Sequence, residues 1–245
     1  MGKYKLRAPV SRRDMGISII LPVFNPFLFW YSSAMKSVIV ANGNFIPTPA
    51  ILSQLHSADL ILAADGGAVH LHELNICPHG IIGDLDSISV EAEDFFSLKN
   101  IPVHRYPARK DSTDTELCIT HAIDRGSREI ILTGVTGHRL DHTLANVFLL
   151  RTLLDRGVKG RIMDAHNEIH LTGSEIIIRG TPGELLSIIP VSDKVTGLTL
   201  EGLEYPLTDK TLVQGSTLGV SNCFAGPTAR ITIKSGLILV IKSTD

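Results

Sequence analysis

The sequence predicts an α/β protein with an N-terminal parallel-sheet α/β domain followed by a C-terminal all-β sandwich. Apolar runs of strand length alternate with helical segments from residue 36 onward, which is typical of a parallel sheet with helices on its faces. From Glu168 the chain changes to short β-branched runs separated by Gly, Pro, Asn or Asp. We therefore expect domains at 36–165 and 166–245, preceded by an extension, residues 1–35, that lies outside the fold.

The strands and helices of the first domain follow from the positions of its apolar residues. Strands are expected over residues 37–41, 60–64, 81–82 with their neighbours, 103–106 and 130–133. Helices are expected over residues 49–56, 68–74, 91–96 and 140–155. One further helix begins at Thr113, because Thr113 and Glu116 fit a capping box, and Gly126 ends it.

The second domain is predicted from a series of β-branched segments. Its expected strands are residues 175–178, 184–189, 195–200, 230–234 and 237–242. Turn-forming residues separate these segments, so each strand is short. Such a series favours a small sandwich.

The composition limits the possible classes of function. The 245 residues are 44% hydrophobic, which suffices for a packed core, and the formal net charge is -2. We expect no nucleic-acid partner, because no basic stripe with interleaved aromatic residues is present. Cys77, Cys118 and Cys223 are odd in number and far apart. They argue against a disulfide framework or a Cys-x-x-Cys zinc site and favour the cytoplasm.

The first 35 residues contain a basic segment and then an apolar one. Lys and Arg residues between positions 3 and 13 precede the apolar stretch 17–31, as in a secretory signal. Pro22 and Pro26 interrupt this stretch, which is also short for a membrane-spanning helix, so we expect no membrane partner. Two explanations stay open: a start site assigned upstream of Met35, or a targeting or peripheral-anchor role.

Four short acidic segments come directly after apolar runs and predict the functional site. They are residues 64–67, 83–87, 110–114 and 137–142. Parallel strands present their carboxyl ends at one edge of a sheet, so we expect these segments to converge. Gathered carboxylates make a hard, anionic site for Mg²⁺ and a nucleotide polyphosphate. A bound cation would also relieve the repulsion between Asp84 and Asp86.

Two of these segments have simpler structural explanations. Asp84 suits a plain turn with Ser87 as the cap of the next helix. Asp111 and Asp114 lie at an expected helix start, where acidic residues stabilise the helix by about 0.3–1 kcal/mol without a ligand. Lys110 could meet a phosphate or lie on the surface.

The other two segments carry glycines, a cation and histidines. The Asp65-Gly66-Gly67 turn permits close backbone approach to a ligand, although the usual dinucleotide and Walker motifs are absent. Arg139 is a candidate cation for phosphate charge. His138 and His142 have the spacing of a zinc pair on a helix, but the sequence suggests no third ligand.

Together these segments resemble the thiamine pyrophosphokinase (thiamine diphosphokinase) family. The acidic segments stand in the family's order, and residues 202–207 followed by 215–222 resemble its thiamine-side signature. The similarity extends from residue 37 to the end. It implies an α/β catalytic domain that binds ATP, a β-sandwich domain that binds thiamine, and a homodimer with thiamine sites between protomers. It also implies pyrophosphoryl transfer from Mg-ATP to the thiamine hydroxyl, giving thiamine diphosphate and AMP.

The resemblance further implies a role for each candidate residue. Mg²⁺ would be held by Asp84, Asp86 and Asp114, which form the catalytic set with Asp111 and Arg139. The expected ATP-binding residues are Asp65, Gly66, Gly67, Lys110, Thr113, Arg139, Asp141 and His142. Thiamine would contact Ser221, Asn222 and Phe224, the last in place of a tryptophan on which some family members stack thiamine. The alternative for Phe224 is a position in the core of the β domain, which is the more common place for a phenylalanine. One carboxylate, with Asp111 as a candidate, would accept the hydroxyl proton.

Two other functions stay open from the sequence. Another Mg-ATP-dependent transferase, acting on a different small alcohol, would share the acidic segments and differ in its β-domain pocket. A non-catalytic regulator that binds thiamine or a nucleotide is disfavoured, because every acidic position is kept and no DNA-binding element is apparent.

Overall fold

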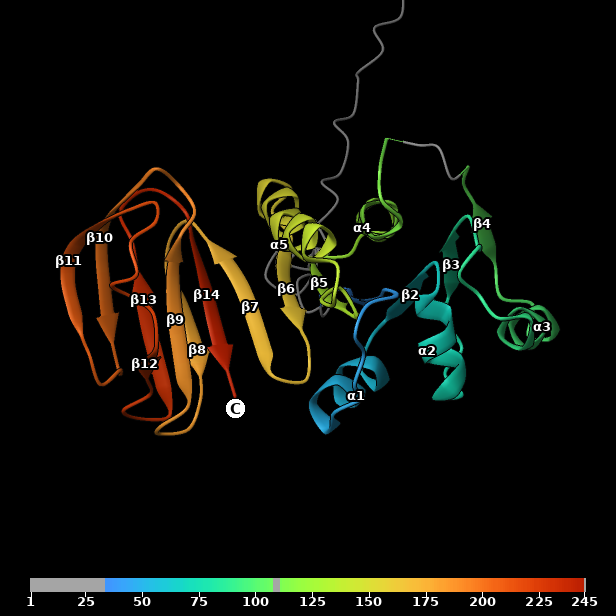
Figure 1. The fold of residues 1–245 in the computed structure, drawn as a ribbon, viewed down its shortest axis with the longest axis horizontal. Coiled ribbons are helices and arrows are strands. Elements are labelled where there is room, and N and C mark those ends of the chain that lie inside the picture. Colours follow the sequence, from blue (N-terminus) through green and yellow to red (C-terminus); the bar gives the residue numbers. More distant parts are fainter. Residues whose placement is uncertain (1–33, 108–110, 245) are drawn as a thin grey trace, which may run out of the picture. The chain divides into compact units, whose positions relative to one another are not determined.

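The computed structural model describes residues 34–107 and 111–244, with alternating strands and helices followed by strands alone (Figure 1). The elements of the first half are β1 (Lys36–Val40), α1 (Pro49–His56), β2 (Leu60–Ala64), α2 (Gly67–Glu73), β3 (Gly80–Gly83), α3 (Val90–Leu98), β4 (Val103–Arg105), α4 (Asp114–Asp124), β5 (Glu129–Thr133), α5 (Leu140–Asp155) and β6 (Lys159–Met163). Residues 1–33 of the expected extension, and Lys110, lie outside the described residues.

Strands β1 to β6 form the parallel part of a ten-stranded sheet, in the order β6-β5-β1-β2-β3-β4. The chain places β2, β3 and β4 on one side of β1 and then returns to place β5 on its other side. The strand order therefore reverses between β1 and β5. In open α/β sheets, ligands bind in the crevice at such a point, outside the carboxyl ends of the strands.

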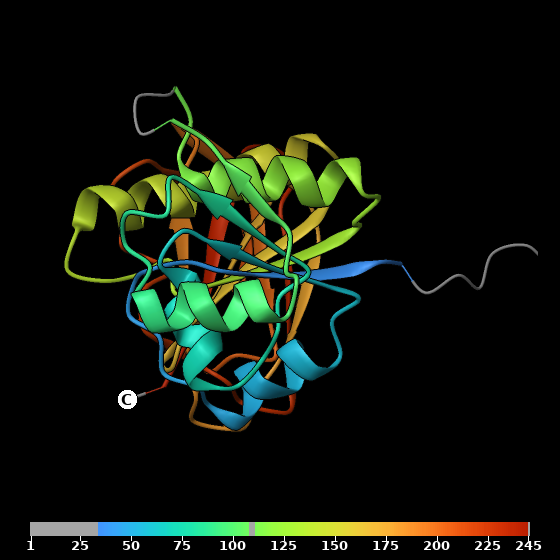
Figure 2. The ribbon, with the colours of Figure 1, turned by 90° about the vertical axis from the view of Figure 1, so that its right-hand side faces the viewer.

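Helices cover both faces of this parallel part, as Figure 2 shows. Helices α4 and α5 pack on one face through buried residues such as Ile119 and Leu153. Helices α1, α2 and α3 pack on the other face through residues such as Leu55, Leu71 and Phe96. Because both faces are covered, β2 is buried along its whole length, which explains its uninterrupted apolar sequence.

Side-chain caps mark where α1, α3 and α4 begin, with Thr48 as the cap of α1. The Oγ1 atom of Thr113 accepts a hydrogen bond from the Glu116 N–H, as the capping box predicts. The cap expected at Ser87 is wrong. Ser89 caps α3 instead, by accepting from the Ala92 N–H, while Ser87 donates to the Asp86 carboxylate.

The second half contains strands only. They are β7 (Asn167–Thr172), β8 (Ile176–Arg179), β9 (Leu185–Pro190), β10 (Lys194–Glu201), β11 (Leu207–Val213), β12 (Asn222–Cys223), β13 (Thr228–Thr232) and β14 (Ile238–Ser243). Strand β7 pairs antiparallel with β6, so the large sheet continues as β7-β14-β9-β12. The four-stranded sheet β11-β10-β13-β8 shares a core with β9 and β14. This arrangement confirms the predicted fold class.

The expected boundary at residue 165 falls in the turn between β6 and β7. One sheet runs through this boundary, since Ile162 of β6 pairs with Ile169 of β7. The division into two domains with separate ligands therefore stays a prediction. Among the described residues, no helix combines the length and the apolar character needed to cross a membrane.

Candidate functional site at the strand-order reversal

A pocket of about 550 Å³ opens at the carboxyl ends of β1, β2 and β5. It is lined by residues 41–44, 64–65, 112–115 and 134–139, with Ser87, His142, Thr143 and Asn146. The loops after β1 and β5 are joined by main-chain hydrogen bonds, from Gly43 N–H to Gly134 C=O (2.6 Å) and from Asn44 N–H to Thr136 C=O (2.7 Å). Parts of all four predicted acidic segments line this pocket.

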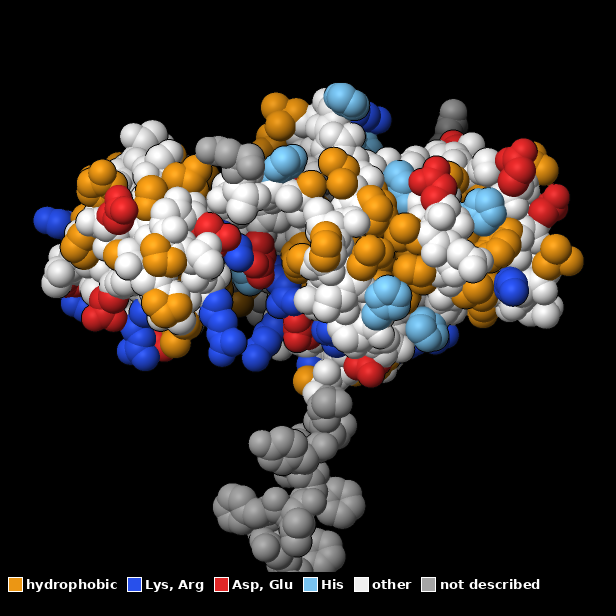
Figure 3. Space-filling model, turned by 90° about the horizontal axis from the view of Figure 1, so that it is seen from below, with side chains coloured by type: hydrophobic (Ala, Val, Ile, Leu, Met, Phe, Trp, Pro, Cys, Tyr) orange, Lys and Arg blue, Asp and Glu red, His pale blue; other side chains and the backbone are white. Residues whose placement is uncertain are grey.

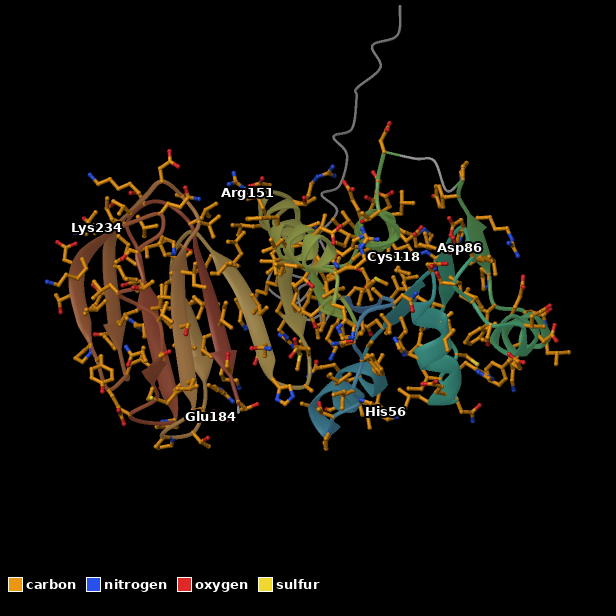
Figure 4. All side chains as sticks on the ribbon, in the orientation of Figure 1. His56, Asp86, Cys118, Arg151, Glu184 and Lys234 are labelled. Atoms are coloured by element: carbon orange, nitrogen blue, oxygen red, sulfur yellow. The ribbon has the colours of Figure 1, made fainter. Side chains whose placement is uncertain are left out.

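Three carboxylates gather beside the pocket, at the ends of β2 and β3. One oxygen of each of Asp65, Asp84 and Asp86 lies within 4.8 Å of the others. Asp65 and Leu85 adopt left-handed backbone conformations (φ 47° and 69°), which turn the chain sharply after each strand. Figure 4 labels Asp86 in this turn beyond β3. The two turns therefore bring together carboxylates that are far apart in sequence.

Asp114 approaches this group from the first turn of α4. A Cβ atom added to Gly83 would lie 3.0 Å from Asp65 Cβ and 3.3 Å from Asp114 Oδ1. The absence of a side chain at Gly83 thus lets both aspartates approach the end of β3. The expected metal ligands were Asp84, Asp86 and Asp114; the structure groups Asp65 with Asp84 and Asp86 and places Asp114 across Gly83.

The carboxylate group suits a hard divalent cation. Asp65 is only 9% exposed, and its buried Oδ1 has no hydrogen-bond partner among the described residues. Asp84 accepts a long hydrogen bond from the Asp86 N–H (3.4 Å), and Asp86 accepts one from the Ser87 hydroxyl (2.9 Å). These contacts leave carboxylate oxygens available, and oxygen ligands are the type that Mg²⁺ and Ca²⁺ prefer.

Arg139 and Asp141 form an exposed ion pair where α5 begins. The Arg139 Nη2 atom lies 2.6 Å from Asp141 Oδ2, with a second contact from Nε to Oδ1 (3.3 Å). The hydrogen bond between them raises the pKa of Arg139 and lowers the pKa of Asp141. In this structure the guanidinium is therefore held by a carboxylate at the rim of the pocket. Arg139 and His142 line the pocket, whereas Asp141 does not.

The remaining predicted residues on the ATP side have distinct positions. Thr113 lines the pocket while it caps α4, and Asp111 is exposed and outside the lining. Gly66 and Gly67 form the start of α2. Within the described ranges, His138 and His142 belong to no group of three potential metal ligands.

The predicted thiamine-side residues lie in the sandwich, near β12. Ser221 is exposed, with φ 58°, and its N–H donates to the Ser187 hydroxyl (3.0 Å). Asn222 is 5% exposed, and its amide bonds to both main-chain groups of Tyr205: it accepts from the N–H (3.0 Å) and donates to the C=O (2.8 Å). Asn222 thus fixes the loop before β11. Of these two residues, only Ser221 has an exposed side chain that a ligand could contact.

Phe224 requires a correction. We expected its ring to form a wall of the thiamine pocket, but the side chain is fully buried in the sandwich core. Its ring packs against Gly180, where a Cβ atom would lie 2.7 Å from two ring carbons. A residue in this position supports the sandwich and presents no surface to a ligand.

Several pocket residues were missed in the sequence. Asn146 of α5 is 8% exposed and donates to the Val135 C=O (2.9 Å), and the Thr143 hydroxyl accepts from the Gly137 N–H (3.2 Å). These two side chains hold the loop after β5. Asn42 and Gly43 also line the pocket directly after β1. Asn42 and Gly43 form a turn just past an apolar run. The acidic segments were identified because they follow apolar runs, and the same criterion could have identified these two residues.

Comparison with known proteins relates both halves of the chain to one family. Residues 52–162 match the model "Thiamin pyrophosphokinase, catalytic domain", and residues 168–238 match "Thiamin pyrophosphokinase, vitamin B1 binding domain". Thiamine pyrophosphokinase of Bacillus subtilis (strain 168) is 33% identical over 216 residues, which cover 86% of this chain and 100% of the relative. Thiamine pyrophosphokinase 1 of Oryza sativa subsp. japonica is 26% identical, and the match covers 86% of this chain and 88% of the rice protein.

Solved structures show the same similarity. The crystal structure of thiamine pyrophosphokinase from Bacillus subtilis superposes with a TM-score of 0.78 at 31% identity, covering 86% of this chain and 99% of that one. A thiamin pyrophosphokinase family protein from Enterococcus faecalis gives a TM-score of 0.73 at 30% identity, with the same coverage. The likeness therefore spans the parallel sheet, the pocket and the sandwich.

Proposed function

This chain belongs to the thiamine pyrophosphokinase family, and we propose that it transfers the pyrophosphoryl group of ATP to the hydroxyl group of thiamine, giving thiamine diphosphate and AMP. The observation that carries this proposal is the carboxylate group of Asp65, Asp84 and Asp86 beside the pocket at the strand-order reversal. Oxygen ligands next to a pocket of this size suit a metal-bound nucleotide triphosphate.

We propose Mg²⁺ as the cation. Mg²⁺ is commonly held by one or two carboxylates together with substrate phosphates, and it retains several waters. Asp65, Asp84 and Asp86 would hold it, with Asp114 supporting the site from across Gly83. When bound, the ion would neutralise charge on the phosphates.

The described residues suit a reaction whose nucleophile belongs to the substrate. Phosphoryl-type transfer requires positioning and charge stabilisation, and the pocket offers fixed polar groups for both. Arg139 would exchange its contact with Asp141 for a phosphate oxygen, since the pair is solvent-exposed and weak. Asp111, exposed before α4, stays our candidate to accept the proton of the thiamine hydroxyl.

We propose that the active enzyme is a homodimer in which thiamine lies between protomers. Strand β12, next to Ser221, and strand β2, next to Asp65, are seven positions apart in the large sheet. At about 4.8 Å per strand, they are roughly 34 Å apart within one chain. A thiamine molecule bound near Ser221 therefore needs the carboxylates of a second copy.

An apolar surface on α5 supports this assembly. Leu140, Leu144 and Phe148 are 65%, 49% and 56% exposed, and their spacing of four residues places them along one side of the helix. Such a stripe on a surface helix is a common feature of protein interfaces. We further propose a cytoplasmic location, because the three widely separated cysteines of the sequence, Cys77, Cys118 and Cys223, do not suggest a disulfide framework.

The decisive test is a product assay with Mg-ATP and thiamine. We expect equal amounts of AMP and thiamine diphosphate. ADP with thiamine monophosphate would identify a simple kinase. Transfer to a different small alcohol but not to thiamine would identify another transferase, and tight thiamine binding without turnover would identify a binding protein.

A further inference from the structure

Asn42 is a pocket residue without an assigned role. It lies two residues after the end of β1, at the point where the strand order reverses, and it lines the pocket. Its side chain is exposed and makes no hydrogen bond with the described residues. The amide is therefore accessible to a bound ligand.

Gly66 leaves the space in which the Asn42 amide lies. A Cβ atom at Gly66 would overlap the carbon, nitrogen and oxygen of the Asn42 carboxamide, so the amide occupies the place where a side chain at position 66 would lie. Gly66 is adjacent to Asp65, whose carboxylate belongs to the proposed metal site. Asn42 is thus seated next to the place where the phosphates would meet the cation.

The charges around the pocket favour a hydrogen-bond donor at this point. Asp65 and Asp114 both line the pocket, and the fixed cation among its described lining residues, Arg139, is paired with Asp141 at the rim. A triphosphate bound beside Asp65 needs donors there that do not compete for the metal carboxylates. A neutral amide N–H meets this need, whereas a lysine ammonium would pair with the aspartates.

We propose that the Nδ2 group of Asn42 donates a hydrogen bond to a phosphate oxygen of the bound ATP. This inference rests on the proposed function and adds a nucleotide-positioning residue to it. The contact joins a rigid strand end to the triphosphate, and it therefore helps to align the bond that breaks.

Two substitutions at Asn42 separate this role from packing on Gly66. Asn42→Asp keeps the size of the side chain, removes the donor and adds a negative charge, whereas Asn42→Ala removes the whole amide. If Asn42 bonds a phosphate, affinity should decrease in the order wild type, Ala, Asp. If Asn42 only packs on Gly66, the Asp variant should resemble the wild type and the Ala variant should be the weaker binder.

The binding probe is Mg²⁺ with a non-hydrolysable ATP analogue, measured by calorimetry on the full chain. We expect a loss of about 10- to 100-fold for Asn42→Ala, the usual size for a hydrogen bond to a charged group, and a larger loss for Asn42→Asp. Inorganic tripolyphosphate with Mg²⁺ serves as a second probe and should show the same order. Melting temperatures should stay close to that of the wild type, since the side chain is exposed.

Each outcome decides a separate question. Equal affinity of all three proteins for both probes would overturn the inference, as would a loss confined to the nucleotide analogue, which would place Asn42 against the base or ribose. Failure of the wild-type protein to bind the analogue at all would instead overturn the proposed function.

Discussion

Individual carboxylates dominate the chemistry of this protein, and their environments differ. Asp65 is nearly buried, and one of its oxygens has no hydrogen-bond partner within residues 34–107 and 111–244, whereas Asp86 is exposed and accepts a hydrogen bond from Ser87. Neighbouring carboxylates repel one another when no cation lies between them. We therefore expect the group to reduce the stability of the metal-free protein while it would create the proposed metal site, which is a common compromise in active sites.

Asp86→Asn should abolish most of the activity without harming the fold. The substitution removes a proposed metal ligand and also removes repulsion from Asp65 and Asp84. We expect kcat/KM to fall by at least about 100-fold, with a melting temperature equal to or above that of the wild type. Asp94→Asn, on the exposed side of α3, is the matched control and should change neither quantity. Turnover of Asp86→Asn within twofold of the wild type would refute the metal-site assignment.

Glu168 illustrates a charged residue with a structural role. It accepts a hydrogen bond from His170 Nε2 (3.1 Å) and lies 3.5 Å from Lys242 Nζ and 3.7 Å from Arg161 Nε. The hydrogen bond to His170, opposed by burial and helped by these charges, lowers the pKa of Glu168 to about 2. Figure 3 shows Lys, Arg and acidic side chains close together where the α/β half meets the sandwich.

Glu168→Gln should therefore destabilise the protein in a pH-dependent way. Because the folded pKa is below the unfolded value of 4.5, the stabilisation is fully present above pH 4.5 and is lost as the pH falls toward 2. We expect a cost of roughly 1–3 kcal/mol at pH 7 and a clearly smaller cost at pH 3. Urea unfolding at both pH values measures it. An equal cost at the two pH values would contradict the ion-pair explanation.

At the scale of elements, the site depends on how closely strand ends and helix starts approach. Gly83 ends β3 at the point where Asp65 and the first turn of α4 come together. Gly83→Ala would push these groups apart by a few tenths of an ångström. Displacements of up to about 1 Å can reduce catalysis by as much as 100-fold, so we expect a loss of roughly tenfold. The melting temperature should fall by only a few degrees.

Gly226→Ala is the matched control for this substitution. Gly226 has open space around its Cβ position and no positive φ, so an alanine meets no obstacle there. The activity and melting temperature of the Gly226→Ala variant should resemble those of the wild type. If Gly83→Ala behaves like this control, the close approach at β3 has no catalytic importance.

Local sequence patterns predicted most elements of the first half, but the expected strands did not include β6, β7, β11 or β12. Strand β11 is exposed at five positions and contains Asp209 and Lys210, so it shows little apolar alternation. Strand β12 has only two residues. Both form because neighbouring strands supply partners: Leu207 pairs with Leu200, and Asn222 with Leu186. Such pairing depends on contacts that a local pattern does not contain.

At the scale of the whole molecule, the large sheet separates the two ends of the proposed reaction. The carboxylates lie beyond β2 and β3, and Ser221 lies beside the opposite edge strand, β12. Under the proposed function, each chain would therefore present half of a complete site at each end. A dimer whose protomers exchange these halves would contain two complete sites.

Mixed dimers test this arrangement. Asp86→Asn inactivates the carboxylate half, and Ser221→Glu blocks the thiamine half with a charged side chain at an exposed position. In co-expressed mixtures, half of the dimers are mixed and each contains one intact site, so activity should reach about one quarter of the wild-type value. Each variant alone should be inactive. No activity in the mixture, despite mixed dimers seen by mass spectrometry, would place each complete site within one chain.

The sequence by itself determined the fold class, most strand and helix positions, the capping of α4 and the four acidic segments, because hydrophobic period, caps and turns are local properties. Tertiary structure decided that Asp65 joins Asp84 and Asp86, that Asn42 lies beside them, that Phe224 is buried, and that Ser221 is far from the carboxylates. The physical reason is that these relations depend on strand order and packing between segments distant in sequence, which the hydrophobic core sets only when the whole chain folds.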